Sequence, residues 1–117
     1  MVGLSAGTRV YLALGATDLR KSIDALALLV EAQFALSALS GHWFAFCNRR
    51  RTLVKVLYWD RNGFCLWQKR LEKETFRWPQ REVDVLEVGA RELLMLLEGM
   101  ELVPRSAHKQ WTYDSMY

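Results

Sequence analysis

The sequence predicts a single small α+β domain, and three observations support this prediction. The chain has 117 residues, which suits one compact core rather than two. Apolar residues recur at helical spacing near residues 18–36 and 89–98, and the segments before and between them have strand-like composition. Asp60-Arg61-Asn62-Gly63 separates two runs rich in Val, Leu, Tyr, Trp and Phe and therefore predicts a β-hairpin. We expect an antiparallel sheet, with elements in the order β-α-β-β-β, and two helices packed on it.

The first strand and the first helix are predicted from residues 8–36. Residues 8–14 are rich in β-formers and end at Gly15, so they predict a strand. Thr17 and Asp18 offer side chains that would cap the N-terminus of a helix running from about residue 18 to about residue 36. The apolar face of this helix would consist of Leu19, Ile23, Leu26, Val30 and Phe34.

Three consecutive strands are expected between residues 42 and 70, joined by short turns into an antiparallel meander. The hairpin should be centred on Asn62-Gly63, a pair that readily supplies the positive φ of a tight turn. Residues 82–88 alternate charged and apolar side chains, so they predict either a further edge strand or the lead-in to the next helix.

A second helix is expected over residues 89–98, with Gly99 as the residue that follows its C-terminus. It would be apolar on nearly every side, which favours a partner interface formed by Leu93, Leu94, Met95, Leu96, Leu97 and Met100. Burial of all these side chains inside the monomer is an equally weighted alternative. Residues 1–103 would form the domain, and the polar segment 104–117 is expected to be a mobile C-terminal tail.

Composition argues against several classes of function. The two cysteines, Cys47 and Cys65, and two histidines support neither a disulfide framework nor a zinc site. The apolar stretch 10–16 is too short to span a membrane, so we expect a cytoplasmic protein without membrane contact. Its carboxylates form no spaced motif, and no Gly-rich phosphate loop or nucleophile motif occurs. We therefore expect no enzymatic activity, no metal and no cofactor.

Positive charge is concentrated in the hairpin region. Residues 49–77 contain nine Lys and Arg against three Asp and Glu, whereas the net charge of the whole chain is only +3. One basic face suits a polyanion, so the candidate nucleic-acid contacts are Arg49, Arg50, Arg51, Lys55, Arg61, Lys69, Arg70 and Arg77. The Arg triplet could equally form a solvated turn, and the hairpin aromatics could be core rather than base-stacking residues.

A second candidate anion contact lies at the predicted start of the first helix. Free backbone N–H groups there favour an anion, and Arg20 and Lys21 would reinforce the site. The alternative is ordinary capping by Thr17-Asp18 with exposed charges in the first turn.

Several segments together resemble a known family. They include Thr17-Asp18-Leu19-Arg20-Lys21-Ser22, Tyr58-Trp59-Asp60-Arg61-Asn62-Gly63, Phe76-Arg77-Trp78-Pro79 and Leu96-Leu97-Glu98-Gly99. In this order, and over nearly the whole chain, they resemble the TnpB accessory proteins encoded by the second open reading frame of the sixty-six-type bacterial insertion sequences.

The resemblance implies a non-catalytic accessory role in DNA transposition, with strand transfer carried out by a separate transposase. The partners it implies are DNA, at the element ends or the target, and the cognate transposase; self-association is a further expectation. Two mechanisms remain open. The basic hairpin would hold DNA, or the protein would act as an adaptor that regulates the transposase without touching DNA.

Overall fold

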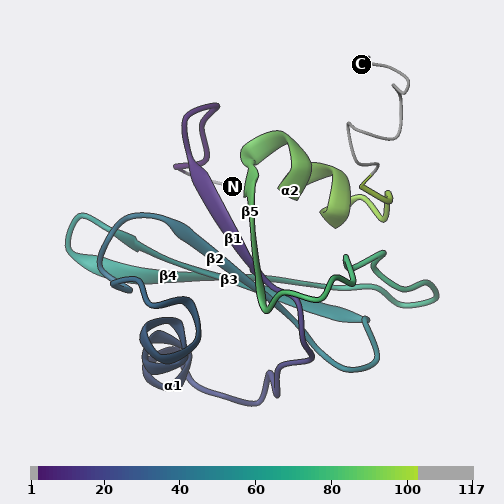
Figure 1. The fold of residues 1–117 in the computed structure, drawn as a ribbon, viewed down its shortest axis with the longest axis horizontal. Helices are drawn as coiled ribbons and strands as arrows, with labels where there is room; N and C mark the ends of the chain where they lie inside the picture. Colours follow the sequence, from purple (N-terminus) through teal and green to yellow (C-terminus); the bar gives the residue numbers. More distant parts are fainter. Residues whose placement is uncertain (1–2, 103–117) are drawn as a thin grey trace.

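A five-stranded sheet with one helix on each face organises the chain (Figure 1). The computed structural model describes residues 3–102, so the tail expected from residue 104 lies outside the described residues. The strands are β1 (Arg9–Ala13), β2 (Trp43–Cys47), β3 (Leu53–Asp60), β4 (Gly63–Arg70) and β5 (Val85–Gly89). The helices are α1 (Ile23–Leu29), which continues into the π-helical turn η1 (Val30–Phe34), and α2 (Ala90–Leu97). The predicted small α+β fold is confirmed.

The sheet is mixed, with the strand order β4-β3-β2-β1-β5. Strands β2, β3 and β4 form the predicted antiparallel meander, and β5 is an edge strand antiparallel to β1. The lead-in alternative for residues 82–88 is thus wrong. One pairing differs from the antiparallel expectation, because β1 and β2 run parallel. The connection through α1 and η1 explains this pairing, since a helical crossover returns the chain to the end of the sheet where β1 began.

The β3–β4 turn is shifted by one residue from the prediction. Asp60 pairs with Gly63, so the two turn residues are Arg61 and Asn62 rather than Asn62 and Gly63. The positive φ, 57°, belongs to Arg61. Both faces of β3 pack in a core, Val54, Val56 and Tyr58 beneath α2 and Leu53 and Leu57 beneath α1, and a one-residue change of register would exchange these two sets.

Helix α1 begins at Ile23, five residues later than predicted. The Asp18 side chain accepts hydrogen bonds from the backbone N–H and the guanidinium of Arg20, so it stabilises a local turn instead of a helix. Ser22 is the actual N-cap, and its Oγ accepts from the Ala25 N–H at 3.3 Å. The predicted Thr17-Asp18 cap is therefore wrong, and Arg20 and Lys21 lie in the loop before α1 instead of in its first turn.

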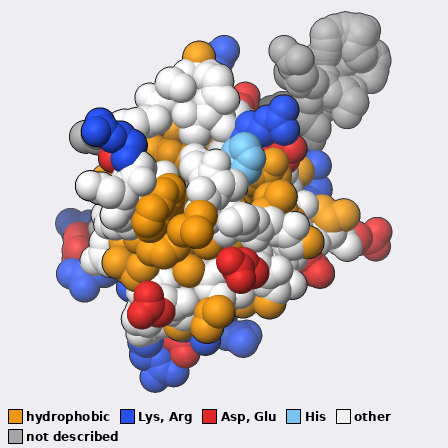
Figure 2. All heavy atoms as spheres, turned by 90° about the vertical axis from the view of Figure 1, so that its left-hand side faces the viewer, with side chains coloured by type: hydrophobic (Ala, Val, Ile, Leu, Met, Phe, Trp, Pro, Cys, Tyr) orange, Lys and Arg blue, Asp and Glu red, His pale blue; other side chains and the backbone are white. Residues whose placement is uncertain are grey.

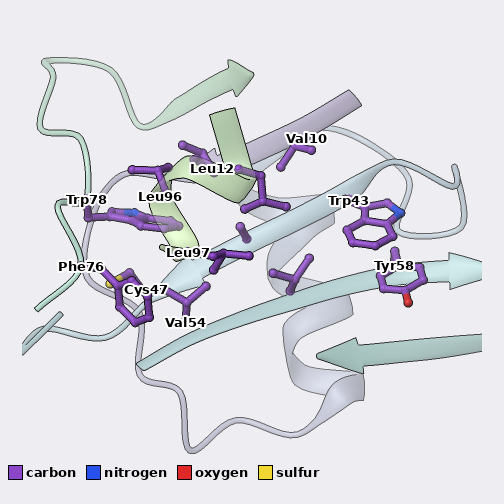
Figure 3. Close-up of a cluster of buried hydrophobic side chains, with 13 residues drawn as sticks. Val10, Leu12, Trp43, Cys47, Val54, Tyr58, Phe76, Trp78, Leu96 and Leu97 are labelled. Carbon is purple, nitrogen blue, oxygen red and sulfur yellow. The ribbon is translucent and has the colours of Figure 1, made fainter. Parts of the chain in front are cut away.

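Two cores lie on opposite faces of the sheet. The core beneath α1 contains the predicted helix-face residues Leu19, Leu26, Val30 and Phe34. The core beneath α2 combines sheet residues with Phe76 and Trp78 from the segment that follows β4 (Figure 3). In this second core the rings of Trp43 and Tyr58 stack with their centroids 3.9 Å apart. Among the hairpin aromatics Tyr58 is therefore a core residue, whereas Trp59, Phe64 and Trp67 are half-buried.

Helix α2 places half of its predicted interface inside the domain. Leu93, Leu96 and Leu97 are buried against the sheet and cannot contact a partner in the folded monomer. Leu94 and Met100 are exposed, at 46% and 51%, and Met95 is half-buried. The alternative of complete burial is wrong as well. The predicted C-terminal glycine is confirmed, because Gly99 has φ 87° and its N–H donates to Leu96 O.

Candidate nucleic-acid interface

The β2–β3 turn displays the arginine triplet. The Arg51 N–H donates to Asn48 O at 3.1 Å, so Arg49 and Arg50 are the two central residues of a β-turn. Both side chains are exposed. Arg51 follows in the left-handed region with φ 61°, a conformation that favours glycine or asparagine.

The Asn48 side chain makes this turn rigid. Its Oδ1 accepts from the backbone N–H groups of Thr52 at 2.9 Å and Leu53 at 3.1 Å. Its Nδ2 lies 3.2 Å from Thr52 Oγ1, to which it donates. These bonds satisfy the backbone within the turn, so Arg49 and Arg50 project from a fixed base rather than from a flexible loop.

Three adjoining hollows surround the turn. The first, about 660 Å³, lies between the β1–α1 loop and the turn and includes Asn48 and Arg49. The second, about 220 Å³, shares these two residues and extends to Arg51 and Trp78. The third, about 390 Å³, shares Arg51 and Trp78. Neighbouring hollows share lining residues, and the three together are here called the arginine trough. Its cations are Arg20, Arg49, Arg50, Arg51, Arg77 and Arg81.

Buried anchors hold the walls of the trough. The Trp78 indole is 4% exposed, and its Nε1 donates to Ala13 O at 2.8 Å. The Phe76 N–H donates to Arg51 O at 2.7 Å. On the other side, the Thr17 N–H donates to Cys47 O at 2.9 Å. Segments far apart in sequence are thus fixed around the β2–β3 turn.

The trough contains both paired and unpaired cations. Arg20 forms an ion pair with Asp18 at 2.9 Å, and its hydrogen bonds hold the pKa of the Asp18 carboxyl well below its usual value. Arg77 lies 3.8 Å from Glu101. By contrast, no carboxylate among residues 3–102 lies within ion-pair distance of Arg49, Arg50, Arg51 or Arg81. The unpaired charge therefore gathers at the turn and beside it.

Arg51 has a polar neighbour instead of an acidic one. With the Gln80 amide turned so that its oxygen faces the guanidinium, that oxygen accepts hydrogen bonds from Arg51. This contact spans the trough between the β2–β3 turn and the segment after Trp78. It orients the Arg51 guanidinium without neutralising its charge.

The predicted nucleic-acid residues do not all meet. Arg20, Arg49, Arg50, Arg51 and Arg77 lie in the trough. Lys21 is exposed beside Arg20 in the chain. Arg70 pairs with Leu53 next to the β2–β3 turn, and its guanidinium forms an ion pair with Glu72 at 3.1 Å.

Three predicted contacts are placed elsewhere by the structure. Lys55 Nζ donates to Leu19 O at 2.7 Å, and Lys69 Nζ donates to Leu97 O near the end of α2 at 2.8 Å. Lys55 therefore holds the β1–α1 loop to the sheet, and Lys69 holds the end of α2 to it. Arg61 lies at the other end of β3, about 26 Å away at about 3.3 Å per residue of strand. These residues do not join the trough.

Sequence reasoning missed Arg81. It lies outside the window of concentrated charge, and only the folded path from Trp78 to Gln80 brings it beside Arg51. The Phe76-Arg77-Trp78-Pro79 segment was the available signal, because proline restricts the residue before it to extended backbone.

The opposite end of the molecule has a different character. The β3–β4 turn lies at the left of Figure 1, and Figure 2 views the molecule from that side. Hydrophobic side chains gather at the centre of this view, acidic side chains lie below them, and Lys and Arg occur mainly around the rim. The Trp59–Phe64 ring pair, with centroids 5.1 Å apart, flanks this turn.

Residues 3–102 contain no group of three or more His, Cys, Asp or Glu side chains arranged to hold a metal ion. None of the helices described is both long enough and apolar enough to cross a membrane.

Fold and surface together define a small α+β domain marked by a fixed cluster of arginines. A family model described as IS66 Orf2 like protein matches residues 8–107, and the chain belongs to this family. Membership implies an accessory role in the transposition of an insertion sequence, in a family without a known catalytic activity.

Two curated relatives come from Sinorhizobium fredii (strain NBRC 101917 / NGR234). The uncharacterized protein y4hO is 36% identical over 101 residues, which cover 86% of this chain and 88% of the relative. The uncharacterized protein y4jC is 29% identical over 101 residues, covering 86% of each chain. No solved structure matches the chain.

Proposed function

We propose that this accessory protein binds DNA, at the element ends or the target, through the arginine trough and without catalysing strand transfer. The observation that carries the proposal is the position of Arg49 and Arg50. They occupy the tip of a turn held by Asn48, are exposed, and have no carboxylate partner among the described residues. We expect the protein to act in the bacterial cytoplasm, where the DNA lies.

The energetics of the turn support this role. Adjacent guanidinium groups repel one another, and an anion such as a nucleic-acid phosphate relieves that repulsion. Arg51 adds a conformational cost, because a non-glycine residue in the left-handed region loses roughly 1 kcal/mol or more. Such strain is found preferentially at functional sites.

The trough suits phosphate contacts better than base reading. Guanidinium groups bind phosphate oxygens in a bidentate manner whatever the base sequence. Arg20 and Arg77, already paired with carboxylates, would extend the contact when a phosphate replaces their acidic partner. We therefore expect binding that tolerates sequence changes and weakens strongly with salt.

A DNA titration tests the proposal. The full chain is titrated with duplexes from the element ends and with unrelated duplexes of the same length, at several salt concentrations, with and without the cognate transposase. We expect similar affinities for both duplexes and a slope of log K against log salt of about −3 to −4, which corresponds to roughly four phosphates. Absence of binding at low salt, both alone and with the transposase, would contradict the proposal.

The second candidate is an adaptor for the transposase, and one observation favours it. Leu94 on α2 and Met100, three residues after its end, are exposed, and Met95 is half-buried. Exposed large apolar side chains are often found in protein interfaces. Under this hypothesis Leu94→Glu abolishes capture of the purified transposase and leaves the domain folded. Unchanged capture by this variant would argue against the outward side of α2 as the contact.

A further inference from the structure

The free edge of β4 carries a separate inference about self-association. This strand is at one end of the sheet, and its eight residues run from Gly63 to Arg70. Nothing in residues 3–102 forms a strand pair on its outer side. A long edge strand without protection offers a row of backbone donors and acceptors to another strand.

The register of the hairpin shows which groups are free. In a two-residue hairpin the closing pair, Asp60 and Gly63, is hydrogen-bonded, and the pattern then alternates along the strands. The Leu71 N–H donates to Thr52 O, which confirms that odd-numbered residues face β3. The backbone groups of Phe64, Leu66 and Gln68 therefore point outward from the sheet.

The usual protections of an edge strand are weak in β4. Residues 63–67 contain no charge and no proline. Lys69, the side chain that would best deter pairing, is drawn away by its bond to Leu97 O on α2. Arg70 is engaged with Glu72 beyond the strand. Protection is thus confined to the last residues of the strand.

The other sheet edge is better protected. Strand β5 has only five residues and leads directly into α2. It also carries Glu87, which lies 3.9 Å from Arg9 of β1. The comparison singles out β4 as the edge open to another strand.

We propose that two copies of this chain pair through antiparallel β4 strands, related by a two-fold axis at Leu66. Hydrogen bonds between the two strands can form only in a register that places the outward backbone groups of one copy opposite those of the other. A two-fold axis at Leu66 meets this condition, because it pairs Leu66 with Leu66 and Phe64 with Gln68 of the other copy. About six backbone hydrogen bonds form across the axis. The two sheets become one continuous sheet of ten strands.

The side chains are self-complementary in this register. Half-buried Leu66 meets its own copy, and on the opposite face Cys65 lies beside Trp67 of the other chain. Arg70 falls opposite Asn62 in the turn, so no like charges on the two strands face each other. A second copy therefore fits this edge without burying an unpaired charge.

The arginine triplets are directed away from the shared axis. In each copy the arginine triplet precedes β3, next to the Arg70 end of β4. Antiparallel pairing directs the Arg70 ends of the two copies to opposite sides of the dimer. Dimerisation thus neither covers the trough nor brings the two basic turns together, and it is independent of DNA binding.

Sedimentation of the full chain over a wide range of concentrations tests the pairing. We expect the weight-average mass to double as concentration rises. Gln68→Pro removes an outward N–H that the dimer needs, so this variant should stay monomeric. It should still fold, because no hydrogen bond within the sheet is lost. Gln68→Ala is the matched control, since it removes the same exposed side chain, keeps the N–H and should dimerise like the wild type.

A measurement on the wild type covers the case in which the proline variant fails to fold. Amide hydrogen exchange at Leu66 and Gln68 should slow severalfold as concentration rises, while exchange at exposed loop amides stays unchanged. A monomer at every concentration would overturn the proposal. So would a dimer that survives Gln68→Pro and is lost in Leu94→Glu, because it would place the interface on α2.

Discussion

Replacing Arg49 and Arg50 together by alanine should lower the salt dependence of DNA binding by a defined amount. If each unpaired guanidinium contacts one phosphate, each contributes about 0.9 to the slope of log K against log salt, so the double variant loses about 1.8. The wild-type slope of about −3 to −4 would become about −1 to −2. Both side chains are exposed, so the melting temperature should hardly change.

The affinity ratio gives the same prediction in another form. Because the double variant loses about 1.8 of the slope, its dissociation constant divided by that of the wild type should be about twelvefold larger at 50 mM salt than at 200 mM. Fluorescence anisotropy with a labelled duplex measures both constants. Equal slopes for the variant and the wild type would refute the assignment of phosphate contacts to this turn.

A matched control separates position from net charge. Arg61→Ala combined with Arg91→Ala also removes two exposed cations, one from the β3–β4 turn and one from α2. These residues lie outside the arginine trough. The control should change the slope far less than the double variant at the β2–β3 turn. A similar loss in both proteins would mean that DNA senses only the overall charge.

Three further predictions concern stability and reactivity. Arg51→Gly should stabilise the domain by about 0.5–1 kcal/mol in chemical denaturation, because glycine relieves the left-handed strain at some cost in chain entropy, and should weaken DNA binding at the same time; lower stability would argue that the Gln80 contact outweighs the strain. Asn48→Ala should destabilise the domain by about 1–3 kcal/mol, since it leaves backbone donors of the turn without an acceptor, and an unchanged melting temperature would contradict this account of the turn. Burial raises the pKa of Cys47 to about 12, so the native thiol keeps its proton at a pH where the unfolded thiol ionises. Stability should accordingly fall as pH rises above about 9, and Cys47→Ala should lessen this fall; identical pH profiles would refute the role of the buried thiol.

Local signals in the sequence predicted much of the fold. The turn at residues 60–63 and the apolar runs beside it predicted the hairpin, and Gly99 marked the end of α2. These features depend on neighbours in the chain, which sequence reasoning can read. The exact turn register was missed, because it depends on which residues of β3 pack in each of the two cores.

Long-range contacts explain the remaining errors. The start of α1 was misplaced because Asp18 bonds to Arg20 in a turn and the Thr17 N–H bonds to Cys47 O, thirty residues away, so both capping candidates are engaged outside a helix. The parallel pairing of β1 with β2 is likewise invisible to local periodicity. In α2 the apolar run could not show which leucines face the sheet, and only burial separates Leu93 from Leu94.

The candidate site was predicted in part for the same reason. The Arg49-Arg50-Arg51 triplet is evident in the sequence, and it lies at the centre of the trough. Lys55 and Lys69 looked equivalent to these arginines, because nothing local indicates that a lysine ammonium will bond to a distant carbonyl. Arg81 was missed for the converse reason, since the fold brings it to Arg51.

The position of β1 between β2 and β5 determines the order in which a nascent chain can complete its structure. Strand β1 is made early, yet its outer neighbour β5 pairs with it only after some seventy further residues have been added. Until then the ribosome-bound chain carries β1 with one side unsatisfied and the core beneath α2 open to water. Closing so long a loop is entropically costly, so docking of β5 and α2 should be the slow phase of refolding. The meander of β2, β3 and β4, built from neighbouring segments, should form before it.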